Sequence, residues 1–527
     1  MRGRPRLPLA LEVCVSSLRT FILITQCSSE LGKWRVLLPC VVGLSLAACS
    51  GRVGSTGAGG SQGGGAGLTV TLRAVPLSPP SHTNLLAFRT TVLGISLIPA
   101  TGGSVNVPLN SDLYRVDLTK LQSDTAFLAF SNAVPAGTYT SMVVSLSDSA
   151  VTFCTQTQGI TGCAAGSVST LSAGPAIPVI TAAPFPLVVT RGQSIGLAVN
   201  INVANALTVD EHTQVIGDVN LGAANVLTAV VLPPSSSSLP SSTLDFIEDV
   251  TGVVSSVDAT KQSVTIETAT RGSITAIAGP STTVSPNCTT FNLGSTFTCA
   301  KQGQVASMET VLNADGTFTL LEYDPLGTTA GDWIEGVIGL PPSSSTQFQL
   351  VTNDLVLAPA NSLIGNNLDL GTPVKVTLAN PKPFVVDTRD LVVPNTSFSG
   401  ATDASVLAPG ETLAIHVVSF TPGSGATPAA ASVDFVYLRF TRVTGSVASA
   451  APPNAFTMQS FPPFFGLTVP ATIQLSSGSS RTNFDGITAA SDLVSGQTAS
   501  IRALYFGPPT GPTPTPSPFT AAKVRIH

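Results

Sequence analysis

A short pattern built around one glycine recurs three times in the C-terminal half of the chain. It reads Val250-x-Gly252-x-Val254, then Ile334-x-Gly336-x-Ile338, then Val443-x-Gly445-x-Val447. Apolar residues that alternate with other residues predict a strand, and a glycine inside a strand marks a bulge or a tight bend. A sheet that bends this sharply can close on itself and then leaves no free edge. We therefore expect three small antiparallel β-barrels in this part of the chain.

Longer repeats surround the three glycines. An alternating strand follows each glycine, at residues 264–266, 348–350 and 456–458, and a further one closes each repeat, at residues 318–322, 433–438 and 522–526. The second and third repeats also align without a gap from Phe398 and Phe484 onward. Within this alignment Gly410-Glu411-Thr412 matches Gly496-Gln497-Thr498, and the first repeat keeps a fainter Gly303-Gln304.

The predicted repeat units are residues 244–326, 333–440 and 441–527. Their period is too long for a stacked solenoid, in which shorter repeats depend on their neighbours. We therefore expect beads that fold independently. The repeated pattern resembles a family called domain of unknown function 5666, and this resemblance implies a repeated barrel module of exported bacterial proteins.

Residues 68–230 are predicted to form a separate β domain. Its apolar runs alternate and are separated by turn residues, which favours antiparallel sheets with one wet face packed as a sandwich. The predicted strands are residues 68–75, 86–98, 113–118, 126–130, 139–146, 150–153, 186–190 and 195–203. A Pro- and Ser-rich linker, residues 231–243, follows. The chain is thus predicted to be all-β, an N-terminal antiparallel β-sandwich followed by three small antiparallel β-barrels.

Two segments of this domain carry a family resemblance. One is Val116-Asp-Leu118 with Leu121 and the apolar residues 126–128, and the other is the Val134-Pro-Ala-Gly-Thr-Tyr139 turn with the alternating residues 141–147. Together and in this order they resemble the bacterial exported family called domain of unknown function 4382. The resemblance implies a β-sandwich on a bacterial lipoprotein and carries over no catalytic residue.

The N-terminal region resembles a bacterial lipoprotein signal. Lys33 and Arg35 precede an apolar run at residues 36–48, which ends in Leu46-Ala-Ala48 directly before Cys49. Such a run is too short to span a bilayer and is typical of an exported signal. We predict cleavage before Cys49, acylation of Cys49, and a flexible Gly-rich tether at residues 49–67. A buried core helix is the alternative, which Pro39 and Gly43 disfavour.

The predicted compartment follows from this signal. Ser50 stands where Asp signals inner-membrane retention in many two-membrane bacteria, so we expect a lipid anchor in the outer membrane, on its periplasmic or surface face. Residues 1–48 then form the signal region, of which residues 1–32 do not fit the pattern. We interpret these first residues as a mis-assigned start, with the true start near Leu31.

Four cysteines beyond Cys49 fall into two local pairs. Cys154 and Cys163 enclose one short polar loop, and Cys288 and Cys299 enclose another. In an exported protein this spacing predicts two local disulfides. A metal site is the alternative, but the CxxC spacing is missing and no histidine is near either pair in the sequence.

Composition and motifs limit the possible functions. Charged residues make up 10% of the chain and hydrophobic residues 43%, with a net charge of −5, and no basic patch is interleaved with aromatics, so nucleic acid is not an expected partner. His82, His212 and His416 are far apart in the sequence, and the Asp210-Glu211-His212 run is better explained as a polar turn than as a metal site. We expect no cofactor.

We expect a non-enzymatic lipoprotein of the cell envelope that presents its modules in a structural or adhesion role. The alternatives are a binding protein for an extracellular glycan, another polymer or a protein partner, and a hydrolase of unknown type. Trp333, Tyr437 and the Phe464-Phe465 pair are candidate aromatic platforms for a glycan, although strand packing is the simpler explanation of Trp333.

Overall fold

Strands make up most of the computed structural model, which confirms the predicted all-β class. The structure describes residues 65–77, 84–154, 162–210, 212–213, 215–233, 242–284, 291–292, 296–297, 299–327, 331–389, 391–393, 397–425, 427–451, 454–476, 482–508 and 517–527. Within these ranges the helical elements are short: η1 (Lys120–Gln122), α2 (Val203–Ala206), η2 (Ala404–Val406), η3 (Pro463–Phe465) and η4 (Ala490–Asp492). None of the described helices has the length and hydropathy needed to cross a membrane.

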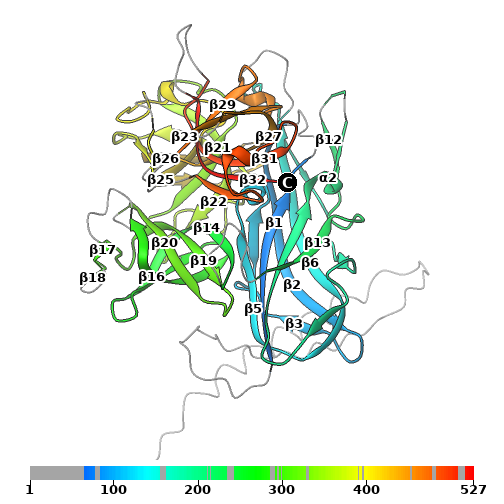
Figure 1. Ribbon diagram of the computed structural model, residues 1–527. Helices are drawn as coiled ribbons and strands as arrows, with labels where there is room; N and C mark the ends of the chain where they lie inside the picture. The colour runs from blue at the N-terminus through cyan, green and yellow to red at the C-terminus, as the bar shows by residue number, and fades with distance from the viewer. Residues whose placement is uncertain are drawn as a thin grey trace, which may run out of the picture. The chain divides into compact units, whose positions relative to one another are not determined.

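Two sheets pack face to face in the N-terminal module, which we call the sandwich (Figure 1). One sheet has the strand order β13-β10-β1-β5, with β1 (Ala66–Val75), β5 (Ala126–Val134), β10 (Ser194–Asn202) and β13 (Leu227–Leu232). The other is built on two long paired strands, β2 (Asn84–Pro99) and β6 (Gly137–Cys154). Shorter strands complete it: β3 (Val105–Val107), β4 (Tyr114–Asp117), β7 (Val168–Ser172), β8 (Val179–Ile180) and β9 (Leu187–Val189). A separate hairpin joins β11 (Leu207–Val209) to β12 (Ile216–Val219).

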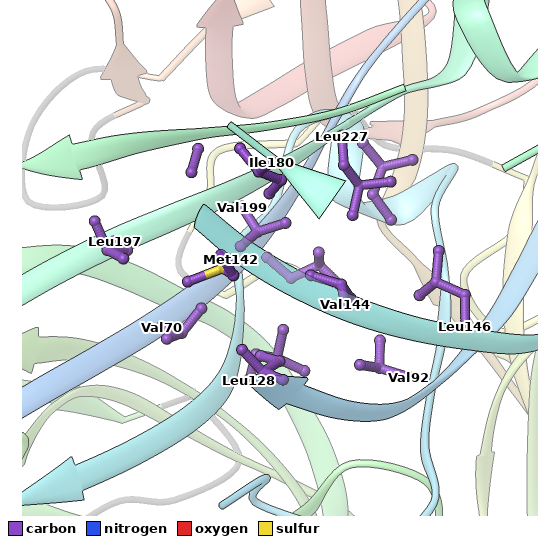
Figure 2. Packing of buried hydrophobic residues seen from close by; sticks show 14 of the residues in the cluster. Val70, Val92, Leu128, Met142, Val144, Leu146, Ile180, Leu197, Val199 and Leu227 are labelled. Carbon is purple, nitrogen blue, oxygen red and sulfur yellow. The ribbon is translucent and has the colours of Figure 1, made fainter. Parts of the chain in front are cut away.

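Alternating apolar side chains fill the space between the two sheets (Figure 2). Val70 and Leu197 come from one sheet, and Met142 and Val144 from the other, and all four are almost completely buried. The alternation predicted for the sandwich is therefore what builds its core. One pairing differs from the antiparallel prediction, because β1 and β10 run parallel.

The strand β6 joins two segments that the sequence predicted as separate strands. Ser147-Asp-Ser149 has the composition of a turn, which is why a break was predicted there. In the structure Asp148 has a φ of 46°, and the pairing with β2 shifts register beside it. The polar residues thus form a bulge within one continuous strand.

The first repeat forms a closed barrel with the strand order β14-β15-β16-β20-β19, drawn in green in Figure 1. Its strands are β14 (Thr243–Asp258), β15 (Ser263–Thr268), β16 (Gly272–Val284), β19 (Val305–Asn313) and β20 (Phe318–Gly327), with a small hairpin of β17 (Phe291–Asn292) and β18 (Thr296–Phe297). The pair β16 and β20 is parallel, so the barrel is antiparallel in all pairs except one.

The second and third repeats have the same topology. In each, the third and fifth strands pair in parallel and complete a ring of five. The second uses β21 (Trp333–Ile338), β22 (Gln347–Val356), β23 (Pro373–Leu378), β25 (Thr412–Thr421) and β26 (Ala429–Arg439), with β24 (Val385–Val386) added. The third uses β27 (Thr441–Ala451), β28 (Ala455–Gln459), β29 (Ala471–Leu475), β31 (Thr498–Tyr505) and β32 (Phe519–Ile526), with β30 (Asn483–Asp485) added. This strand order is that of the OB-fold, a five-stranded Greek-key barrel.

The three motif glycines allow neighbouring strands to approach closely. A Cβ atom on Gly252 would lie 2.2 Å from the carbonyl oxygen of Glu267, one on Gly336 would lie 2.4 Å from that of Val351, and one on Gly445 would lie 2.8 Å from that of Gln459. No side chain fits at these distances, so each barrel needs glycine where its first two strands meet.

Candidate functional site at the junction of the modules

Strand register identifies equivalent positions in the three barrels. Val250, Ile334 and Val443 on the first strands pair with Met308, Ile415 and Ile501 on the fourth strands. Those fourth-strand residues pair in turn with Tyr323, Val436 and Val524 on the fifth strands. The three barrels can therefore be compared position by position.

One cross-strand pair on the outer face of each barrel differs sharply in chemistry. It is Glu309 opposite Glu322 in the first barrel and Arg502 opposite Lys523 in the third. The second barrel has His416 opposite Phe435 at this place. Like charges placed directly opposite each other destabilise a sheet, and burial together with Asp324 and Glu309 raises the pKa of Glu322 well above its usual range.

Ion pairs join the first barrel to the third, and Glu309 also pairs with Arg389 of the second barrel. Arg502 Nη2 lies 2.5 Å from Glu309 Oε1, and Lys523 Nζ lies 2.6 Å from Glu248 Oε1. Glu248 and Lys523 are almost completely buried. Burial raises the pKa of Glu248 and lowers the pKa of Lys523, so burial opposes the charged form of both partners. The close contact between them offsets this desolvation cost.

Asp249 of the first barrel is the centre of the junction. Its Oδ1 accepts hydrogen bonds from Nη2 of Arg389 and Nη2 of Arg439, at 3.1 and 2.7 Å. Its Oδ2 lies 3.0 Å from Lys120 Nζ and accepts from Arg442 Nη2 at 2.5 Å. Burial alone would raise the pKa of Asp249, but these four cations hold the pKa well below its usual range. The cations come from the sandwich, the second barrel and the third barrel, so one carboxylate contacts all three other modules.

The sandwich reaches the junction through residues 118–125, which we call the hub segment. Lys120 Nζ donates to Glu335 Oε1 at 2.9 Å and to Asp354 Oδ2 at 3.1 Å in the second barrel. Asp124 Oδ2 accepts from Arg442 Nη2 of the third barrel at 2.8 Å.

Further bonds join the hub segment to the first and third barrels. The backbone N–H of Thr125 donates to Glu248 Oε2 of the first barrel at 3.1 Å. Arg525 Nη1 of the third barrel donates to the carbonyl oxygen of Asp124 at 2.8 Å. A short stretch of the sandwich therefore binds all three barrels.

A second contact region lies at the predicted disulfide. The structure contains the Cys154–Cys163 disulfide. Next to it, the N–H of Cys163 donates to the carbonyl oxygen of Gly339 in the second barrel, and the N–H of Gly162 donates to that of Phe464 in the third, both at 2.7 Å. The disulfide loop thus joins the sandwich to two barrels.

The structure gives mixed outcomes for the other predicted site residues. Cys299 is disulfide-bonded, but Cys288 lies outside the described residues, so their pairing stays a prediction. Cys49 and the whole signal region also lie outside the described residues, as does His82.

The predicted aromatic platforms are wrong. Trp333 and Tyr437 are 5% and 7% exposed, and Phe464 and Phe465 are 3% and 2% exposed. Trp333 packs against Val253 and Leu326 of the first barrel, and the two phenylalanines lie in the core of the third barrel. These rings stabilise contacts within and between the barrels instead of offering a flat surface to a sugar.

His212 and His416 each lie next to an aspartate. Asp210 Oδ1 accepts from the backbone N–H groups of His212 and Thr213, each at 2.8 Å, which is the predicted turn. His416 Nδ1 lies 2.6 Å from Asp434 Oδ1. Among the described residues no group of three or more His, Cys, Asp or Glu side chains is placed to hold a metal ion.

The buried charges of the junction were missed by the sequence analysis. Lys523 and Arg525 alternate with apolar residues in β32, a pattern that ordinarily indicates a solvated face. Independent folding of the repeats stays a prediction, and the contacts that these residues make lead us to propose coupled modules below. In agreement with this, residues from Ser61 to His527 belong to one compact unit.

Comparisons with known proteins concern mainly the sandwich. No curated protein matches this chain. A solved structure described as drosophila Unr CSD456 matches with 9% identity and a TM-score of 0.11 over 53% of this chain and 95% of its own, a likeness too weak to support any argument. Residues 66–224 match the model of the family described as Domain of unknown function (DUF4382).

Proposed function

We propose that this protein is a non-enzymatic, lipid-anchored scaffold of the bacterial cell envelope, in which the sandwich holds three barrels in one fixed arrangement. The observation that carries this proposal is the contact of Asp249 with cations of the three other modules. A buried charge that loses its partners is strongly destabilising, so separation of any module from the others is unfavourable.

The chemistry of the junction supports a structural role. Glu335, Asp387 and Glu248 are paired with Lys120, Arg439 and Lys523, and these side chains are shielded from water. Catalytic acids and bases instead need a free position within reach of a substrate. In this proposal the few charges of a sparsely charged chain serve to assemble modules.

The anchoring half of the proposal rests on the sequence before Cys49. A diacylated cysteine holds a protein stably at a bilayer, because each buried CH₂ group contributes about 0.8 kcal/mol. The tether after Cys49 leads directly to β1, which lies between β10 and β5 in its sheet. In the order of the chain the sandwich therefore comes first after Cys49, and the barrels follow it.

Cell fractionation tests the anchor. The wild-type protein is expected in the outer-membrane fraction, and Cys49→Ser is expected in the soluble fraction with an unchanged fold by circular dichroism. Mass spectrometry of the wild-type N-terminus should show a lipid-modified Cys49. An unmodified Cys49 or a membrane-bound Cys49→Ser variant would contradict the proposal.

A further inference from the structure

The Cys154–Cys163 disulfide lies inside the contact between the sandwich and the second and third barrels. Cys154 is 1% exposed and Cys163 is 2% exposed. Both cysteines belong to one buried apolar cluster with Val337 and Val351 of the second barrel and with the core of the third barrel. Residues of two barrels therefore contribute to the cover over this bond.

Hydrogen bonds hold the barrels at both ends of the disulfide. The N–H of Cys163 donates to the carbonyl oxygen of Gly339 in the second barrel at 2.7 Å. Asn84 is paired with Cys154 in the ladder of β2 and β6, and its Oδ1 accepts from the N–H of Phe464 in the third barrel at 3.0 Å. Each cysteine thus lies at a point where the sandwich is bound to a barrel.

The packing beside Cys163 is tight. Gly162 has a φ of 82°, and its N–H donates to the carbonyl oxygen of Phe464 at 2.7 Å. A Cβ atom on Gly162 would lie 2.7 Å from Pro409 Cγ and 2.8 Å from Pro341 Cδ of the second barrel. This side of the bond has no room for a methyl group, and therefore none for a thiol reagent.

Thiol–disulfide exchange needs direct access to a sulfur atom. In reduction, a thiolate attacks one sulfur of the disulfide and displaces the other sulfur as a thiolate. In formation, one cysteine thiolate attacks the disulfide of an oxidant, and the second cysteine thiolate then displaces the oxidant from the mixed disulfide. The protein loses two electrons and two protons, and the oxidant becomes a dithiol. Neither direction can proceed while the barrels cover both sulfur atoms.

We propose that docking of the second and third barrels locks the oxidation state of the Cys154–Cys163 disulfide. An exchange reagent reaches the bond only when the barrels move away, and the bond forms before the barrels dock. The oxidant of an exported chain is a disulfide-bearing protein of the export compartment, which is too large to enter the closed junction. The inference rests on the fixed arrangement of modules proposed above and does not depend on the lipid anchor.

Reduction of the folded, full-length protein by dithiothreitol tests the lock. Differential alkylation and mass spectrometry follow each cysteine separately, in water and in urea below the unfolding transition. Cys299 is disulfide-bonded and only half-buried, so it is the internal reference. We expect Cys154 and Cys163 to be reduced at least about tenfold more slowly than Cys299. Their rate should rise with urea, because undocking exposes surface to the denaturant.

The variant Asn84→Ala tests the role of the third barrel. It removes the acceptor of the Phe464 N–H and leaves both cysteines in place. We expect reduction of Cys154 and Cys163 to become about tenfold faster, because a buried N–H without an acceptor is costly, while the rate of Cys299 stays unchanged. The control Asn366→Ala changes an exposed amide of the second barrel and should change no rate. The urea series uses the wild type and therefore decides the question even if Asn84→Ala does not fold.

Three results would overturn the lock. They are reduction of Cys154 and Cys163 as fast as that of Cys299, a rate that urea does not change, and an unchanged rate in folded Asn84→Ala. Calorimetry of the oxidised protein separates the lock from the scaffold. Separate transitions of the modules would contradict the fixed arrangement, whereas a single transition together with fast reduction would contradict the lock alone.

Discussion

The first and third barrels share one strand topology and carry opposite charges at equivalent positions. Glu309 and Glu322 face each other in the first barrel, where Arg502 and Lys523 face each other in the third. Across the junction Arg502 binds Glu309 and Lys523 binds Glu248, and Glu309 also pairs with Arg389 of the second barrel. The two barrels are therefore complementary partners and not interchangeable copies.

The difference shows how repeats of one fold can be assembled in a defined order. Two acidic faces or two basic faces would repel each other, so charge selects the pairing of the first barrel with the third. The second barrel has His416 and Phe435 at this position and contributes Arg389 and Arg439 to Asp249 instead. Each barrel thus has its own chemical role at the junction.

Loss of the central carboxylate should have the largest effect on this arrangement. Asp249→Asn leaves Lys120, Arg389, Arg439 and Arg442 without their shared partner, and we expect a loss of about 3–5 kcal/mol in the free energy of unfolding. Chemical denaturation followed by circular dichroism measures it.

The matched control is Lys261→Met, which breaks the exposed Lys261–Asp258 pair. Such a pair contributes at most about 1 kcal/mol. If Asp249→Asn costs no more than this control, the junction does not stabilise the protein.

A second prediction compares one turn in the three barrels. Glu411 Oε2 accepts from the N–H of Ala408 at 3.0 Å. Gln304 Oε1 and Gln497 Oε1 accept from the equivalent N–H groups in the other barrels. Burial without a nearby cation raises the pKa of Glu411 to about 8. Since the unfolded chain releases this proton near pH 4.5, the free energy of unfolding should fall as the pH rises from about 4.5 to 8.

Glu411→Gln should remove this pH dependence. We expect the variant to be more stable than the wild type by about 5 kcal/mol at pH 9 and equally stable at pH 4. The mirror variant Gln304→Glu places a carboxyl at a buried position and should introduce the same pH dependence into the first barrel. Thermal melts from pH 4 to 9 measure this dependence. Identical stability profiles of the wild type and Glu411→Gln would show that Glu411 ionises in the folded protein without loss of stability.

A charge exchange between the first and third barrels should have a smaller effect. Glu248→Lys and Lys523→Glu each place like charges in contact, whereas the double variant restores an ion pair of reversed polarity. We expect each single change to destabilise, and the double variant to recover about 2 kcal/mol relative to the sum. Additive losses in this double-mutant cycle would mean that the two side chains are not coupled.

Much of the fold could be predicted from the sequence because local patterns determine it. The alternation at residues 68–75 and 195–203 and the glycines Gly252, Gly336 and Gly445 identify strands and bends that the structure contains. The parallel pairs β1–β10, β16–β20, β23–β26 and β29–β32 could not be predicted, since pairing of distant strands leaves no local pattern.

The junction could not be predicted for a related reason. Lys120, Asp249 and Arg439 are far apart in the sequence, and each has the appearance of an ordinary surface residue when considered alone. Their burial depends on the association of complete modules. Only 10% of the residues are charged, and many of them stand within apolar strands. This combination is the signal that could have indicated buried ion pairs.

Differential scanning calorimetry of the wild-type protein at pH 7 tests the central claim most directly. If the junction couples the sandwich to the three barrels, the protein should unfold in one transition whose calorimetric and van't Hoff enthalpies agree. Two or more separate transitions, each with the enthalpy of a single module, would contradict this account and restore the model of independent beads.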